Sequence, residues 1–217
     1  MFGLQALTRA RRPALLLLGW AAAGAAWAHP HAWIDVRSTV VVSPAGMVAA
    51  IEEEWLFDEL YTTYVVEEMA GGRAPTAEVA AGFAGQVIEN LGPYGYFTKV
   101  AADGRPVALA PVTQYHSEMR GDRLVLRFTA RLAQPVDPAR HAFSYAIYDP
   151  TYFIEMKHDA NSPPALRGSE PGRCRLDVRQ PRPDPRAAAR AFAMDRGAPA
   201  DDTLGRLFAE RVVMACR

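Results

Sequence analysis

Apolar and polar residues alternate along two neighbouring stretches near the start of the chain. Residues 33–42 alternate and are rich in β-branched side chains, and residues 47–56 repeat this pattern. Between them, residues 43–46 contain a proline and a glycine that are placed to reverse the chain. A period of two puts every second side chain on the same face of a strand. The pattern therefore predicts two strands joined by a turn.

The spacing of apolar residues then becomes helical. Asp58 can cap a first helix, which the pair Gly71 and Gly72 ends. Residues 76–91 carry a second apolar stripe at helical spacing. Both helices read as an insertion between pairs of strands, at about residues 57–91.

Alternation returns beyond residue 95, where turn signals separate five predicted strands: residues 97–101, 107–115, 123–132, 142–148 and 174–178. Residues 160–173 read as loop, and the proline-rich residues 181–185 read as an irregular linker. Residues 187–193 and 202–215 are predicted to be short helices, with an extended conformation as the alternative for the very end.

Together these elements predict an α+β fold: a β-sandwich-like antiparallel domain with an inserted helical pair. The domain covers residues 29–180, and residues 181–217 form a C-terminal tail with short helices. A domain of this size is long enough to bury its own core.

Residues 1–28 have the three parts of a cleavable secretion signal. Arg9, Arg11 and Arg12 give a positive start, residues 14–26 are apolar, and residues 26–28 (AWA) supply the small-x-small cleavage pattern. The apolar run is too short to span a bilayer, which needs about 20 residues. We therefore expect a periplasmic protein that begins at His29 and has no stable membrane insertion after cleavage.

The charge and the cysteine content are consistent with a periplasmic location. The signal contains three of the 24 basic residues, so its removal leaves 21 basic and 24 acidic residues. The chain has no basic patch, so we do not expect nucleic acid as a partner. Cys174 and Cys216 form an even pair in a compartment that permits disulfides. A disulfide between them ties the tail back to the domain and stabilises by roughly 4 kcal/mol in the chain-entropy account.

Cleavage after Ala28 leaves the α-amine and the imidazole of His29 on one residue. These two nitrogens can chelate a metal ion, and the imidazole of His31 can complete a three-nitrogen site that suits Cu(II) or Ni(II). Pro30 has no backbone N–H, so the square-planar motif that needs a deprotonated second amide is excluded. We expect a transition metal ion (Ni, Co, Zn or Cu) as the ligand.

In an extended start, His29, His31, Trp33 and Asp35 share one face, while Ala32, Ile34 and Val36 face the core. Asp35 or Asp149 can then add a carboxylate to the metal site. The alternative is a solvated terminus in which Asp35 is a surface charge and Asp149 ends a strand at an Asp-Pro turn. Three further histidines are interpreted as surface residues: His116, His141 and His158. The alternative is that folding brings one of them near His29, and His158 is the most suggestive because of Asp149.

Five segments carry a resemblance to a known family: residues 29–35 (HPHAWID), 55–59 (WLFDE), 94–98 (YGYFT), 148–153 (YDPTYF) and 207–213 (LFAERVV). In them the chain resembles the bacterial family called domain of unknown function 1007, whose members are often labelled as periplasmic components of an ABC-type transport system. The resemblance implies a secreted accessory in transition-metal handling, since such proteins are frequently encoded near exporters of the nickel/cobalt type. It implies no settled activity.

Three functions stay open on this basis. The first is a non-enzymatic metal-binding protein that presents or buffers metal for a membrane transporter, of the nickel/cobalt exporter type or the ABC type. The second is an enzyme in which the terminal histidine holds copper for oxidative attack. The third is a metal-free structural partner of a membrane protein, with the helical pair as its docking surface.

Overall fold

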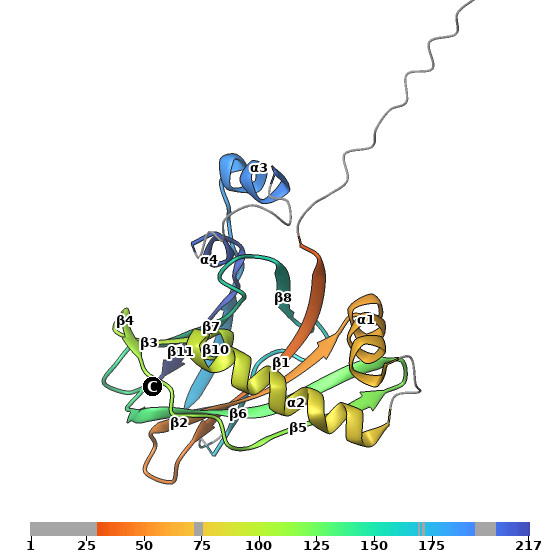
Figure 1. The fold of residues 1–217 in the computed structure, drawn as a ribbon. Helices are drawn as coiled ribbons and strands as arrows, with labels where there is room; N and C mark the ends of the chain where they lie inside the picture. The colour runs from red at the N-terminus through yellow and green to blue at the C-terminus, as the bar shows by residue number, and fades with distance from the viewer. Residues whose placement is uncertain (1–29, 72–75, 169, 171, 194–202) are drawn as a thin grey trace, which may run out of the picture.

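The computed structural model describes residues 30–71, 76–168, 170, 172–193 and 203–217, which form an α+β fold with two β-sheets (Figure 1). The signal predicted for residues 1–28, and His29, lie outside the described residues. The first sheet has the strand order β5 (Tyr115–Arg120), β6 (Arg123–Val136), β2 (Val48–Phe57), β1 (Ala32–Val42) and β8 (Ile154–His158), and β9 (Ala165–Arg167) also pairs with β1. The second sheet has the order β10 (Cys174–Arg179), β11 (Arg211–Cys216), β7 (Phe143–Ile147), β3 (Thr98–Ala102) and β4 (Arg105–Val107).

The first inserted helix begins and ends at the cap and the glycine that the sequence predicts, and the second begins one residue later than predicted. Helix α1 (Glu59–Ala70) begins after Asp58, whose carboxylate accepts from the backbone N–H of Tyr61, and a left-handed Gly71 ends it. Thr76 caps α2 (Ala77–Leu91) in the same way, and a 3-10 helix (Gly92–Phe97) follows. Later in the chain come α3 (Pro185–Ala193) and α4 (Gly205–Phe208). In the described residues, no helix is long and apolar enough to cross a membrane.

The prediction of a purely antiparallel domain is wrong for the first sheet. Strand β1 pairs antiparallel with β2 on one side, but parallel with β8 and β9 on the other. Strand β9 lies inside residues 160–173, which were expected to be a loop. The second sheet is antiparallel throughout its described pairings. The fold is therefore α+β with one mixed and one antiparallel sheet.

Two other predicted elements differ from the structure. The strand expected over residues 107–115 is interrupted, because the chain crosses from the second sheet to the first and makes only an isolated bridge between Leu109 and Leu132. The helix expected over residues 202–215 is wrong for most of its length, because α4 covers only Gly205–Phe208 and residues 211–215 belong to β11. Val212 and Met214 are buried while Arg211 is exposed, which is the period of a strand. The extended alternative is therefore correct for the end of the chain.

One hydrophobic core contains side chains from both sheets and from the inserted helices. Ala32, Ile34 and Val36 are each at most 2% exposed, which confirms the predicted inward face of β1. Trp55 of the first sheet and Tyr145 of the second are each 1% exposed. Helix α2 packs on β5, and its Phe83 lies edge-on against Phe57 at the end of β2, with ring centroids 5.4 Å apart.

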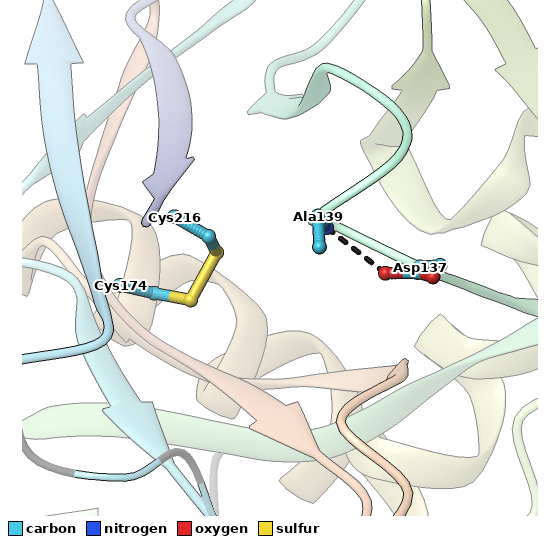
Figure 2. Close-up of a disulfide and its surroundings, with 4 residues drawn as sticks. All are labelled: Asp137, Ala139, Cys174 and Cys216. Atoms are coloured by element: carbon cyan, nitrogen blue, oxygen red, sulfur yellow. Dashed lines mark hydrogen bonds between the residues drawn. A yellow bond between two sulfur atoms is a disulfide. The ribbon is translucent and has the colours of Figure 1, made fainter.

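The disulfide predicted from the cysteine count joins Cys174 to Cys216 (Figure 2). The two residues lie directly opposite each other in the antiparallel pairing of β10 with β11. Strand β11 is an inner strand, between β10 and β7. The predicted C-terminal tail therefore contributes a strand to the interior of the second sheet, and the cross-link fixes the end of that strand.

Candidate functional site

His31 lies directly before β1 and is held against the segment that leads into β8. Its backbone N–H donates to the carbonyl of Phe153 at 2.8 Å, and the two rings lie 4.6 Å apart. Trp33, two residues further on, is 47% exposed, and its backbone N–H donates to the Asp58 carboxylate at 2.8 Å. This end of β1 thus places a half-buried histidine, whose Nε2 is buried, and an exposed indole beside the cap of α1.

Three segments that are far apart in the sequence meet at this end of the molecule. They are residues 30–35, 148–153 and 207–213. The ring of Tyr152 stacks on that of Phe208, with centroids 4.1 Å apart. The backbone N–H of Gly205 donates to the carbonyl of Pro150 at 2.8 Å. A Cβ on Gly205 would overlap the carbonyl of Asp149, so only glycine permits this close approach.

Asp149 shapes the turn that carries Tyr152 and Phe153. Its side chain is buried, and its carboxylate accepts from the backbone N–H and hydroxyl of Thr151 and from the backbone N–H of Ile154. Tyr152 has a positive φ of 60°, a conformation that costs energy in a non-glycine residue. The hydrogen bonds of Asp149 hold this turn in place, so its role here is structural.

Asp35 lies further along β1 and has a different partner. Its carboxylate forms an ion pair with Arg123 at 2.8 Å, on the exposed face of the first sheet. Four residues of extended strand separate it from His31, a distance of about 13 Å. The structure therefore does not bring Asp35 to His31.

Sequence reasoning missed a carboxylate on the strand next to this end of β1. Glu155 pairs with Trp33 in the parallel register of β1 with β8, so both side chains are on the same face. The Tyr152 hydroxyl donates to Glu155 at 3.4 Å, and Lys157 forms an ion pair with it. Only the parallel pairing reveals this position, because the strand that contains Glu155 was not predicted.

Within the described part of the chain, no group of three His, Cys, Asp or Glu side chains is arranged to hold a metal ion. His31 is described and His29 is not, so the metal roles of His29, His31, Asp35 and Asp149 remain predictions. A three-ligand site at this end of β1 would need the α-amine and imidazole of His29 together with His31.

Comparison with known proteins places the chain in a family. Residues 14–216 match the family described as "Protein of unknown function (DUF1007)". The chain belongs to the DUF1007 family.

Relatives of this DUF1007 protein carry no functional description. An "Uncharacterized protein" of Haemophilus influenzae is 26% identical over 204 residues, which is 93% of this chain and 97% of that protein. An "Uncharacterized 15.5 kDa protein in trpE 3'region" of Spirochaeta aurantia is 26% identical over 92 residues, which is 42% of this chain and 65% of that protein. No solved structure matches the chain.

A chain of buried polar side chains crosses the core of this DUF1007 protein, between the two sheets. Nδ1 of His158 lies 2.9 Å from a carboxylate oxygen of Glu210, and Nε2 lies 3.1 Å from the hydroxyl of Ser38. The Ser38 hydroxyl also lies 2.7 Å from that of Tyr145. The interpretation of His158 as a surface residue is wrong, because its side chain is 7% exposed.

Glu210 of this network and Glu53, a second buried carboxylate outside it, have strongly shifted pKa values in opposite directions. Burial raises the pKa of Glu53 to about 8, and hydrogen bonds from Thr98 and Trp55 offset this only in part. Burial also acts to raise the pKa of Glu210, but hydrogen bonds from His158 and Gln180 outweigh it and lower the value to about 2. Glu53 is therefore neutral at pH 7, and Glu210 is ionised.

The order serine, histidine, carboxylate is that of a nucleophilic triad. Ser38, however, is 4% exposed, and its hydroxyl is already shared between His158 and Tyr145. A substrate has no path to this hydroxyl while the core is packed. We therefore interpret the network as a structural link that joins β1 and β8 to β7 and to the segment before β11. No single sequence motif predicts it, because its four members lie at positions 38, 145, 158 and 210.

Proposed function

We propose that this protein is a periplasmic, non-enzymatic accessory that binds a transition metal ion and presents it to a membrane transporter. The metal is Ni, Co, Zn or Cu, and the transporter is of the nickel/cobalt exporter type or the ABC type. His29 binds the ion through its α-amine and imidazole after the signal is removed, and His31 supplies a second imidazole. In this proposal the two sheets are a sandwich-like scaffold for the terminus.

One observation carries the proposal. The backbone of His31 is hydrogen-bonded to Phe153 and its ring contacts the Phe153 ring, only two residues after the predicted terminus at His29. A terminus that starts so close to a paired strand has few free backbone dihedrals, so ordering it around a metal ion costs little conformational entropy. A long flexible leader would lack this advantage.

Surrounding groups support a terminus that binds and releases metal. Trp33 and Phe153 are 47% and 38% exposed and flank His31, which gives the site an apolar rim. The carboxylate of Glu155 lies on the same face and can orient an imidazole through a hydrogen bond, as outer carboxylates do in metal sites. Metal is the cargo in this proposal and not a resident cofactor.

The test is a calorimetric titration of exported protein whose N-terminus has been verified by mass spectrometry. Ni²⁺, Co²⁺, Zn²⁺ and Cu²⁺ are titrated separately into wild type and into His29→Ala and His31→Ala variants. We expect the Kd of the bound metal to rise at least about 100-fold on loss of His29, because even outer-sphere partners contribute 10- to 100-fold. A form with one extra residue before His29 keeps both imidazoles but moves the α-amine, and should lose as much.

His116→Ala is the matched control, since this imidazole is 64% exposed and lies on β5, far along the sheet from β1. Its removal should leave the Kd unchanged. Equal affinities of wild type and His29→Ala would refute the proposal, as would a natural N-terminus other than His29.

A metal-free structural partner of a membrane protein is the second candidate. The observation that favours it is on α1, where Leu60 is 76% exposed and Tyr64 is 61% exposed. These residues lie one turn apart on one side of the helix. Co-purification of the transporter with metal-free protein, lost in a Leu60→Ser/Tyr64→Ser variant, would favour this candidate over the first.

A further inference from the structure

A cavity of about 780 Å³ lies where the edge strand β4 of the second sheet approaches the end of β6 in the first. Its volume is within the range of small-molecule sites, about 300–1,000 Å³. Apolar side chains make up one part of its lining, including Val107, Ala133, Pro135 and Val136. Met47 also lines it, so the cavity is next to the turn between β1 and β2, at the opposite end of β1 from His31.

The polar part of the lining contains a rigid pair, His141 and Asp103. Nδ1 of His141 lies 2.6 Å from one carboxylate oxygen of Asp103, and the other oxygen accepts from the backbone N–H of Ala142 at 2.9 Å. The hydrogen bond from His141 lowers the pKa of Asp103, as does that from Ala142. A carboxylate only accepts, so Nδ1 is the donor. The pairing leaves Nε2 of His141 as the ring nitrogen available to a ligand.

The formal charges of the lining balance when His141 is neutral, because Asp103 and Asp137 are matched by Arg105 and Arg140, and a protonated His141 adds one positive charge. Asp103 is paired with His141, and Arg140 lies 3.6 Å from the carboxylate of Asp137. Arg105 lines the same cavity and acts on Asp103 only through its charge. No ion pair of Arg105 occurs among the described residues. An unpaired guanidinium beside an apolar wall favours a ligand that combines an anion with an apolar body.

We propose that this cavity binds a small organic acid, whose carboxylate is held by Arg105 and Nε2 of His141 and whose apolar part packs against Val107 and Pro135. In the imidazolium form both ring nitrogens of His141 donate, so Nε2 can donate to the ligand while Nδ1 keeps Asp103. The guanidinium supplies a forked donor that matches carboxylate geometry. This site is separate from the proposed metal site, and its ligand is a second one.

Octanoate is the probe, because it joins one carboxylate to a short apolar chain. Its Kd is measured by calorimetry on the whole exported protein, and its position by chemical-shift changes in labelled protein. We expect saturable binding, with shifts confined to residues of the cavity. Arg105→Ala should weaken binding about 10-fold or more, since a hydrogen bond to a charged group contributes about 1.5–3 kcal/mol. His141→Ala should weaken it to a similar extent.

Three further measurements separate the possible causes. Octylamine has the same apolar chain with the opposite charge and should not bind, whereas equal binding would overturn the proposal in favour of apolar adsorption. Succinate has the carboxylates without the chain and should bind more weakly than octanoate. Arg131→Ala removes an exposed arginine of β6 that bonds to Gln114 outside the cavity, and should leave the octanoate Kd unchanged.

An octanoate Kd that is the same in wild type and Arg105→Ala refutes the site, provided that circular dichroism shows both proteins folded. Failure of this proposal is distinguishable from failure of the metal proposal, because His29→Ala should not change octanoate binding and Arg105→Ala should not change metal binding.

Discussion

The protein contains two histidine–carboxylate pairs of nearly equal geometry in contrasting surroundings. His158 and Glu210 lie 2.9 Å apart in the core, with side chains 7% and 8% exposed. His141 and Asp103 lie 2.6 Å apart at the lining of a cavity, with side chains 49% and 53% exposed. In the first pair Nε2 is taken by Ser38, whereas in the second it is available to a ligand.

The comparison teaches that burial, and not the contact itself, decides what such a pair can do. Removing one partner of a buried charged pair leaves the other without compensation, which is costly. An exposed pair is solvated whether or not its partner is present, and contributes little to stability. The core pair therefore serves the fold, and the cavity pair is free to serve a ligand.

The largest effect is expected from His158→Ala. The substitution removes the ring donor and leaves the ionised Glu210 buried, so we expect a loss of about 3–5 kcal/mol in the free energy of unfolding. Urea unfolding followed by tryptophan fluorescence measures it. Glu210→Gln is the milder variant for the case that His158→Ala does not fold, with an expected loss of about 1–3 kcal/mol. If both variants were as stable as wild type, the conclusion that the core pair serves the fold would be wrong.

Next in size is the effect of Glu53→Gln on the pH dependence of stability. Because the folded protein holds a proton on Glu53 up to about pH 8 and the unfolded chain releases it near pH 4.5, wild type should lose stability as the pH rises between these values. The slope is about 1.4 kcal/mol per pH unit for one proton. A glutamine needs no proton, so its amide can bond to Thr98 and Trp55 at every pH.

The difference between wild type and Glu53→Gln should therefore vanish below about pH 4.5 and grow to about 3 kcal/mol in favour of the variant at pH 7. Urea unfolding at a series of pH values measures this. A difference that does not change with pH would show that Glu53 is ionised in the folded protein.

The smallest effect is expected from His141→Ala on stability. Both members of this pair are about half exposed, so the midpoint of urea unfolding should stay at the wild-type value. The same variant is expected to lose octanoate affinity. His141→Ala should therefore impair ligand binding, whereas His158→Ala should impair stability. A large destabilisation would show that the cavity pair is structural as well.

Local signals allowed the first third of the fold to be predicted. The alternation in β1 and β2, the cap Asp58 and the glycine pair that ends α1 are each complete within a few residues of sequence. The disulfide followed from the count of cysteines in a chain that was expected to be exported. These features need no knowledge of distant parts of the chain.

What could not be predicted depends on contacts between distant segments. Strand β8 is short and half charged, and its partner β1 lies more than 110 residues earlier, so the parallel pairing has no local signature. From sequence alone, the residues at the start of β11 fit a helix as well as a strand, and only the pairing with β10 decides between the two. For the same reason the position of Glu155 beside Trp33, and the buried contacts of His158, emerge only in three dimensions.

The central place of β1 has a consequence for how the molecule is made. If the chain crosses the inner membrane from its N-terminus, as its leader predicts, β1 arrives first, but the strands on its far side, β8 and β9, end only at Arg167. Until then one edge of the earliest strand has no partner and its apolar side chains are open to wrong neighbours. For an exported chain, translocation and correct folding would then be tied in time, and a periplasmic chaperone would act on this interval.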